Sequence, residues 1–480
     1  MSILFAAPWR KWLVVPLVLL ALYVTAIVFR PPLPIDETRY LSVAWEMFLR
    51  AGWFEPLTLN FEPYHHKPPM LFWLISAAWS TFGVSRWAAV IPVVLTSMLS
   101  AYLAALLCRR LLPRLCWRAL LILLGSAGFL LYSTAILFDL TLTVFVLGSL
   151  LFLLAYANER RVIYAVAMGL LLGGGVLTKG PVAWLYWVFP FLLAPYWMRD
   201  KRNWVSWYAG GAAALLISAV TVLCWLVPVL MTSSSEFGYW LVWEQTAGRV
   251  TGSYTSSHAR PFYFYLGVLP ILLLPWILFP RFWRGIAAIR REGVERGGVR
   301  FLIAWVVPTI VCFMLISGKQ PHYLVPLLPG LAILAAVATA SVTERALGTT
   351  VAAMVLIFIA AHAAFTVRIN DHYDLRPLAQ FMRQNIDRDW SYSGSRYRGE
   401  LTFLARLDRP LENPDLEDLP AWFDAHPDGF AVILYDNQSE IAGFEMHLTH
   451  LYRGKSMGIF SRRDEQQPEV LSARPVARRS

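Results

Sequence analysis

The chain has 480 residues, of which 57% are hydrophobic and only 15% are charged, and its formal net charge is +11. Soluble domains carry charge on about 25% of their residues, so this composition excludes a soluble globular protein and indicates a polytopic membrane protein. The positive charge does not indicate nucleic-acid binding, because it is concentrated in short segments between apolar runs, where membrane topology and anionic headgroups account for it.

Eleven uncharged runs approach the length of about 20 residues that a helix needs to cross the hydrocarbon core. Lipid offers backbone groups no other hydrogen-bonding partner, so each run is predicted to be helical. We expect the first to be a retained span, since no small-residue cleavage site follows it. The predicted spans are residues 12–29, 87–108, 119–138, 140–158, 162–178, 180–198, 207–231, 261–280, 301–318, 323–343 and 346–367.

Clusters of arginine and lysine occupy alternate connections between these runs. They lie at residues 10–11, 109–118, 160–161, 199–202 and 281–300. Such clusters mark the cytoplasmic side of a membrane. The amino terminus is therefore predicted to be cytoplasmic, and the remaining connections, together with the carboxyl-terminal segment, are predicted to lie on the outer face.

Changes in composition divide the chain into a transmembrane domain at 1–367, a small α/β domain at 368–463 and a disordered tail at 464–480. In the transmembrane domain, the first external loop at 30–86 includes a segment, SVAWEMFLRAGWF, with the apolar spacing of an interfacial amphipathic helix. In the α/β domain, LRPLAQFMRQNI is predicted to be helical, and GFAVILYD and GKSMGIFSR are predicted strands.

Three acidic residues stand at predicted membrane boundaries. Asp36 and Glu37 follow the first span, where they could cap the next helix or orient and deprotonate an attacking hydroxyl group. Asp139 interrupts an apolar stretch that is too long for one span, so we expect it in a tight external turn. Turn chemistry alone explains an aspartate there, whereas acids at membrane depth are more often functional.

Three lysines, Lys67, Lys179 and Lys319, each lie beside Gly or Pro at the outer end of a predicted span. One such lysine could simply extend its charge to the interface. Three of them, together with Arg39, indicate a pocket that neutralises a phosphate or diphosphate.

Metal-binding patterns are absent from the sequence. The external histidines show no HxxxH or HExxH spacing, and the four cysteines lie within or beside predicted spans, where they form neither a zinc motif nor a disulfide framework. We therefore expect no required cofactor; a divalent metal stays an alternative that no motif indicates. The histidines in question are His65, His66, His258 and His322.

Six short elements occur in a characteristic order: DETRY, KPP, FD, LTKGP, EQTAGR followed by HARPFYFY, and SGKQPHYLVPLLP. Over roughly residues 10–340 they resemble the bacterial membrane glycosyltransferases related to protein O-mannosyltransferases, and most of all the ArnT family of lipid A aminoarabinose transferases. The resemblance implies an all-α GT-C bundle of about 11 transmembrane helices, with interfacial helices in the first external loop and a small periplasmic α/β domain after the bundle.

The resemblance also implies a reaction, in which a sugar moves from a polyprenyl-phosphate donor to an envelope glycan, lipid or protein at the periplasmic face of a bacterial inner membrane. This chain has His66 where those transferases carry an acidic residue before the loop lysine, so a distinct substrate is expected. The implied roles are a catalytic aspartate at Asp36, a phosphate-contacting arginine at Arg39, a loop lysine at Lys67, a second acid at Asp139, and a late lysine and tyrosine at Lys319 and Tyr323.

Two other functions use similar residues. A transporter or flippase of polyprenyl-linked sugars would carry ionisable or helix-breaking residues in mid-span, whereas here they gather at one face. A non-catalytic envelope sensor would not need Asp36, and a transferase would.

Overall fold

The computed structural model describes residues 9–198, 203–243, 259–292, 297–368 and 372–463. The chain divides into two compact units, Met1–Asn370 and Asp371–Ser480, and each is described by itself. The predicted disordered tail at 464–480 lies outside the described residues.

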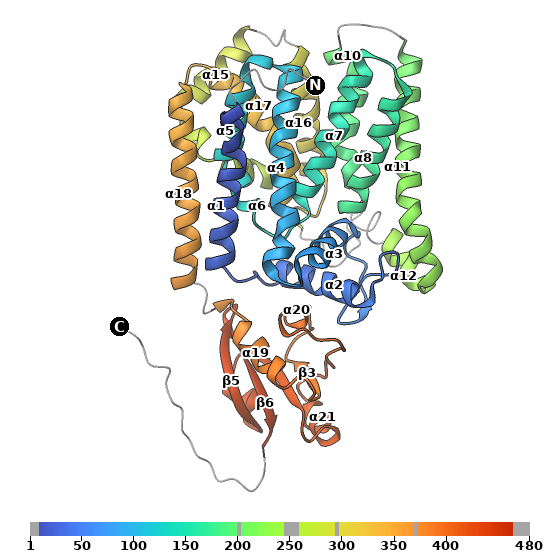
Figure 1. Cartoon of the computed structure of the whole chain (residues 1–480), viewed down its shortest axis with the longest axis vertical. Helices are drawn as coiled ribbons and strands as arrows, with labels where there is room; N and C mark the ends of the chain where they lie inside the picture. The colour runs from blue at the N-terminus through green and yellow to red at the C-terminus, as the bar shows by residue number, and fades with distance from the viewer. Residues whose placement is uncertain (1–8, 199–202, 244–258, 293–296, 369–371, 464–480) are drawn as a thin grey trace. The chain divides into compact units, whose positions relative to one another are not determined.

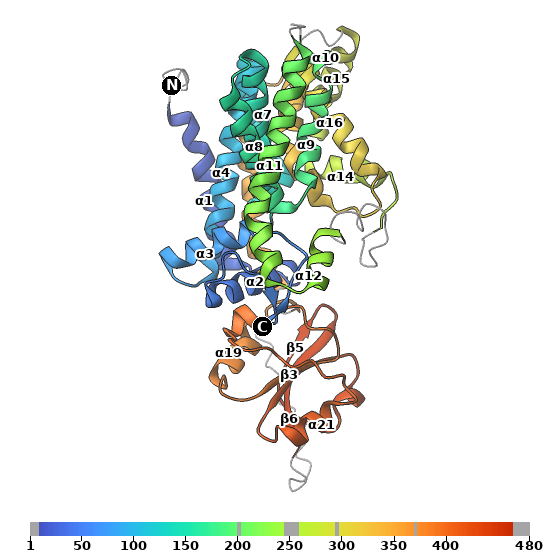
Figure 2. The same ribbon diagram turned by 90° about the vertical axis from the view of Figure 1, so that its right-hand side faces the viewer.

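The first unit is a bundle of apolar helices (Figures 1 and 2). Within the described residues, eight helical segments are long and apolar enough to cross a membrane. They are the η1–α1 segment (Trp9–Leu13 and Val14–Phe29), α4 (Arg86–Leu111), α7 (Asp139–Asn158), α8 (Val162–Lys179), α11 (Trp204–Thr232), α16 (Gly297–Leu315), the η5–α17 segment (Pro321–Leu327 and Leu328–Ala338) and α18 (Glu344–Arg368). The chain is thus a multi-pass membrane protein.

Small residues let neighbouring helices in this bundle approach closely. A Cβ atom on Gly169 would lie 2.7 Å from the Ala214 carbonyl oxygen, and one on Gly173 would lie 2.6 Å from Cβ of Thr221, so α8 packs tightly on α11. Close backbone approach through glycine is a common basis of helix association in lipid, where the hydrophobic effect cannot drive it.

The structure differs from the sequence prediction at three apolar runs, where the helix is interrupted. The pieces are α5 (Cys116–Gly125) and α6 (Ala127–Tyr132), α9 (Val182–Leu192) and α10 (Ala194–Trp197), and α14 (Phe264–Leu272) and η4 (Trp276–Leu278). Prolines lie at the last two interruptions, where each removes a backbone donor and crowds the preceding turn.

No proline breaks the helix between α5 and α6, and a distant tryptophan stabilises the interruption instead. The Trp276 indole donates hydrogen bonds to the Ile122 carbonyl at 2.8 Å and to the Ser126 hydroxyl at 3.0 Å. The Ala127 amide donates to the Leu274 carbonyl at 2.8 Å. These partners come from a segment 150 residues away, so the apolar pattern of residues 119–138 could not reveal them.

The first external loop forms an interfacial layer at one end of the bundle. It contains α2 (Asp36–Arg50), a short hairpin of β1 (Thr58–Leu59) and β2 (Glu62–Pro63), and α3 (Met70–Phe82). The amphipathic helix predicted around Trp45 is α2, which begins earlier, at Asp36. These elements and α12 (Ser235–Tyr239) lie at the end opposite α10 and α15 (Pro280–Glu292) (Figures 1 and 2).

The second unit contains a four-stranded sheet in the order β3-β4-β6-β5. Strand β4 (Phe430–Tyr435) runs parallel to β3 (Trp390–Ser393) and antiparallel to β6 (Lys455–Arg462), which pairs with β5 (Phe444–Tyr452). The two predicted strands correspond to β4 and β6, and the predicted helix to α19 (Arg376–Gln384). Because β4 is a central strand, Val432 packs into one hydrophobic core and Ile433 into another. The short helices α20 (Thr402–Ala405), α21 (Leu419–Ala425) and η7 (Gln438–Ile441) complete this unit.

Candidate active site

A buried ion pair joins the facing ends of α7 and α8. Asp139 is the first residue of α7 and Lys179 the last of α8, and the Asp139 carboxylate pairs with the Lys179 ammonium group while their side chains are only 3% and 6% exposed. An acid at a helix N-terminus and a base at a C-terminus both interact favourably with the helix dipoles. Asp139 therefore stands at a helix start rather than within the tight turn expected from the sequence.

Tyr323 lies beside this pair. The Lys179 ammonium nitrogen is 4.8 Å from the centroid of the Tyr323 ring, which is within cation–π range. The Tyr186 hydroxyl donates to the Tyr323 carbonyl at 2.7 Å and fixes the backbone there. The structure thus brings together three of the predicted site residues, Asp139, Lys179 and Tyr323, from three separate helical segments.

A second acidic–basic pair occupies the first turn of α2. Asp36 and Arg39 form an i,i+3 ion pair in which the Asp36 side chain is 54% exposed and the Arg39 side chain 23%. The Arg39 guanidinium lies 5.4 Å from the centroid of the buried Tyr40 ring. Exposed ion pairs contribute little to stability, so either partner can exchange the other for a substrate group at small cost.

Lys67 and Phe138 connect the two pairs. The Lys67 ammonium nitrogen lies 5.7 Å from the Phe138 ring centroid, and the Tyr40 and Phe138 rings meet edge to face at 5.0 Å. Two carboxylates and three cations therefore gather around one aromatic contact at the interfacial end of the bundle.

Lys319 faces a different environment. Its side chain is buried, and its ammonium group donates to the backbone carbonyls of Arg260 at 2.9 Å, Ile316 at 2.5 Å and Ser317 at 3.4 Å. These bonds hold the chain after α16 against residues 259–260, where Ala259 forms a β-bridge with Gly318. The contacts support a structural role for Lys319, and the phosphate contact expected from the sequence stays a prediction.

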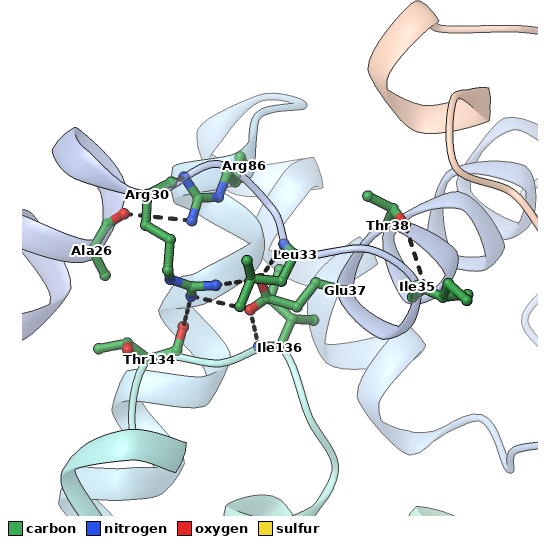
Figure 3. Close-up of polar contacts among 9 residues, drawn as sticks. All are labelled: Ala26, Arg30, Leu33, Ile35, Glu37, Thr38, Arg86, Thr134 and Ile136. Carbon is green, nitrogen blue, oxygen red and sulfur yellow. Dashed lines mark hydrogen bonds and ion pairs between the residues drawn. The ribbon is translucent and has the colours of Figure 1, made fainter. Parts of the chain in front are cut away.

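Glu37 is likewise buried among protein donors (Figure 3). Its carboxylate accepts hydrogen bonds from the Arg30 guanidinium at 2.5 and 3.1 Å, from the Leu33 amide at 2.7 Å and from the Ile136 amide at 2.8 Å. Burial alone would raise the pKa of Glu37, but the charge and hydrogen bonds of Arg30 hold that pKa below its usual value. A direct substrate contact by Glu37 also stays a prediction.

The sequence interpretation missed Arg30, Arg86, Tyr40 and Phe138 as parts of this region. Arg30 and Arg86 lie at the ends of apolar runs, where a cation is ordinarily read as a boundary marker. The two aromatic residues lie in or next to segments rich in apolar residues. A signal was present for Tyr40, which belongs to the DETRY element, and for Phe138, which belongs to the FD element.

The histidines of the first external loop lie close together but form no metal-binding group with other described residues. Within the part of the chain that the structure describes, no group of three or more His, Cys, Asp or Glu side chains could hold a metal ion. The rings of His65 and His66 are 4.4 Å apart, and His65 meets the Trp240 ring at 5.1 Å. His258 and the EQTAGR segment lie outside the described residues.

The sequence of this chain is similar to the sequences of known membrane transferases. Residues 66–225 match the family model of dolichyl-phosphate-mannose-protein mannosyltransferases. The undecaprenyl phosphate-α-4-amino-4-deoxy-L-arabinose arabinosyl transferase of Pseudomonas aeruginosa (strain UCBPP-PA14) is 30% identical over 381 residues, which cover 75% of this chain and 66% of that protein. The second transferase of this kind in Pseudomonas fluorescens (strain Pf0-1) is 31% identical over 62% of this chain and 54% of its own length.

Solved structures show the same fold. ArnT from Cupriavidus metallidurans, bound to undecaprenyl phosphate, matches with a TM-score of 0.77 at 19% identity, covering 95% of this chain and 98% of that one. The Archaeoglobus fulgidus oligosaccharyltransferase matches with a TM-score of 0.58 at 13% identity, covering 97% of this chain and 75% of that one.

The bundle, its interfacial layer and the charged site at that layer define a class of multi-pass membrane proteins with a charged site at one membrane boundary. Within that class the chain is ArnT-like, since its sequence matches the aminoarabinose transferases and its fold matches that of ArnT. The resemblance inferred from the ordered sequence motifs is thereby confirmed. The sequence matches span from about half to two thirds of the length of these curated relatives.

Proposed function

We propose that the chain transfers a sugar from a polyprenyl-phosphate donor to an acceptor of the bacterial envelope, such as lipid A, another glycan, a lipid or a protein. The observation that carries this proposal is the convergence of Asp36, Arg39, Lys67, Asp139 and Lys179 on the Phe138 contact. The relatives named as undecaprenyl phosphate-aminoarabinose transferases support it, and so does the undecaprenyl phosphate in the ArnT structure with the same fold.

In the proposed reaction, an acceptor oxygen attacks the anomeric carbon of the donor sugar. The bond between that carbon and the phosphate oxygen breaks, and its electron pair leaves with the lipid phosphate. Asp36 orients the acceptor and takes its proton, because its carboxylate is exposed at the start of α2. A single displacement of this kind inverts the anomeric configuration.

The basic residues stabilise the charge that develops during the reaction. Lys67 and Arg39 offset the negative charge that develops on the leaving phosphate, an effect that commonly contributes the largest share of catalysis. Asp139 keeps Lys179 ionised and fixed within the buried pair, so that Lys179 can add to the positive field without a flexible side chain. The proposal assigns no step to a metal or another cofactor.

We infer that the reaction takes place at the periplasmic face of the inner membrane, and that the carboxyl-terminal segment is exported to the periplasm. The α2–α3 layer lies at one end of the bundle, whereas Arg109 and Arg110 end α4 at the other. Arginine-rich connections favour the cytoplasm, which supports this orientation.

The test is an assay of the purified chain with synthetic undecaprenyl-phosphate sugars and envelope acceptors, in which mass spectrometry follows both products. Donor-dependent release of undecaprenyl phosphate with glycosylation of one acceptor is expected, and chelation of divalent cations should not prevent it. Movement of intact donor across a vesicle membrane without its consumption would instead identify a flippase. The acceptor is found by comparing envelope lipids and glycans from cells with and without the protein.

A further inference from the structure

Glu37 contacts both segments that carry the two candidate acids (Figure 3). One contact runs to the Leu33 amide, three residues before Asp36, and the other crosses to the Ile136 amide, three residues before Asp139. The Arg30 guanidinium spans the same two segments, because it pairs with Glu37 and donates to the Thr134 carbonyl at 3.2 Å.

The Glu37 carboxylate has no capacity left for a substrate. Its Oε2 accepts from Arg30 and Leu33, and its Oε1 accepts from Arg30 and Ile136, so all of its roughly four lone-pair positions are used. The side chains of Glu37 and Arg30 are 5% and 7% exposed. Because the Glu37 carboxylate is enclosed in this way, it can influence the reaction only through the residues that it holds in place.

Arg86 extends this network to α4. Its guanidinium donates to the Arg30 carbonyl, just past the end of α1, and to the Ala26 carbonyl in the last turn, which also accepts from the Arg30 amide (Figure 3). The end of α1, the start of α2, the start of α4 and the segment before α7 are thus joined through three side chains, those of Arg30, Glu37 and Arg86.

We propose that Glu37, held by Arg30, is a positioning residue that sets the separation between Asp36 and the Asp139–Lys179 pair. The inference rests on the proposed function. Asp36 would act on the acceptor while the field of Lys179 acts on the donor phosphate, so the reaction depends on the distance between two elements that are over 100 residues apart in sequence. Misplacement of reacting groups by about 1 Å can lower a rate roughly 100-fold.

The first test measures the local stability of the two segments that Glu37 contacts, and it needs no substrate. Hydrogen–deuterium exchange is measured on peptides covering 33–37 and 133–139 in the wild type, Glu37→Gln and the matched control Glu55→Gln. Glu55 is a 52% exposed carboxylate that pairs with Arg50 at 3.7 Å in the same external loop. We expect exchange to be roughly tenfold faster in both peptides for Glu37→Gln, because a neutral amide loses the charge-assisted bonds, and unchanged for Glu55→Gln. Unchanged exchange in Glu37→Gln would overturn the inference.

The second test separates positioning from binding and from folding. Glu37→Gln and Arg30→Gln should each lower kcat by about 10- to 100-fold per folded molecule, with the donor KM changed less than about twofold. The double variant should be no worse than either single variant, because both remove one interaction. Arg30→Lys, which keeps the charge, should recover part of the rate.

Three results would overturn the inference. These are a normal kcat in folded Glu37→Gln, a raised donor KM in Glu37→Gln that Arg30→Gln does not share, and additive losses in the double variant. If Glu37→Gln does not fold, the milder Arg30→Lys decides the same questions. Failure of the proposed function can be distinguished from failure of this inference, because it would appear as absent transfer in the wild type. The exchange measurement would still report whether Glu37 holds the two segments.

Discussion

The Lys67 ammonium group lies against the ring of Phe138, with its nitrogen 5.7 Å from the ring centroid, and Phe138 is the residue directly before Asp139. Lys67 belongs to the first external loop, whereas Phe138 and Asp139 lie at the start of a membrane-spanning helix. The loop and the bundle therefore share one charged site, which is the arrangement expected if the phosphate of a lipid donor binds at the membrane boundary.

Asp36→Asn should remove most turnover. The amide keeps the size of the side chain but cannot accept a proton, and general-base contributions amount to about 100- to 10,000-fold in rate. Donor binding should stay nearly unchanged. The measurement is transfer and donor binding on the same purified sample, with Glu62→Gln, an exposed carboxylate in β2 of the same loop, as the control. Full activity in Asp36→Asn would refute the assignment.

Lys67→Ala should weaken binding of the lipid phosphate. Loss of a charge-assisted contact costs about 1.5 to 3 kcal/mol, so affinity for bare undecaprenyl phosphate should fall together with affinity for the donor. Lys11→Ala, which removes an exposed lysine near the amino terminus, is the matched control. Equal binding by the wild type and Lys67→Ala would leave Lys67 as a structural residue.

Asp139 and Lys179 should be coupled in stability. Either Asp139→Asn or Lys179→Met leaves one buried charge unpaired, which typically costs about 3 to 5 kcal/mol in the free energy of unfolding, whereas the double variant should recover most of this loss. Turnover should remain low in all three. Thermal unfolding in detergent measures the coupling, and Glu159→Gln, from an exposed pair with Arg161, should unfold like the wild type. Two independent, additive losses would contradict the prediction.

Stability of the second unit should depend on pH through Asp374. This carboxylate accepts bonds from the Arg376 guanidinium at 2.7 to 3.0 Å and from the Arg376 amide at 3.0 Å. Burial alone raises the pKa of Asp374, but Arg376 lowers it overall. A lowered folded-state pKa means that the stabilisation is present above the unfolded aspartate pKa of about 3.9 and disappears as the pH falls through the folded value.

Asp374→Asn should therefore cost about 1 to 2 kcal/mol near neutral pH, and the difference from the wild type should vanish in acid. Hydrogen exchange of peptides from α19 in the full chain reports this locally. Asp424→Asn removes an exposed partner of Arg462 and should change little. A difference that persists unchanged at a pH where Asp374 is protonated in the folded protein would contradict the assignment.

A reporter enzyme that is active only after export, fused after residue 463, should be active. The same reporter inserted among residues 109–118 should be inactive, because that arginine-rich connection is expected to stay in the cytoplasm. Activity patterns opposite to these would move the charged site to the cytoplasmic face and remove the proposed periplasmic reaction.

The sequence by itself determined the class of the protein, the position of most spans and the main candidates for chemistry. Lipid excludes charge and unpaired backbone groups, so long apolar runs have few alternatives to helix, and a residue such as Asp139 stands out against them. The order of short motifs around Asp36, Lys67 and Lys179 also identified the family, because charged residues and prolines in such an order are distinctive in a chain that is otherwise apolar.

Only the tertiary structure decided which charged residues meet, and what each one contacts. Glu37 and Asp36 are adjacent in sequence, yet a helix turns successive side chains by about 100°, so one is enclosed by Arg30 and the other is exposed. Lys319 resembles Lys179 in its local sequence but is surrounded by backbone carbonyls. Long-range contacts such as these depend on how the helices pack, and neither apolar periodicity nor motif spacing contains that information.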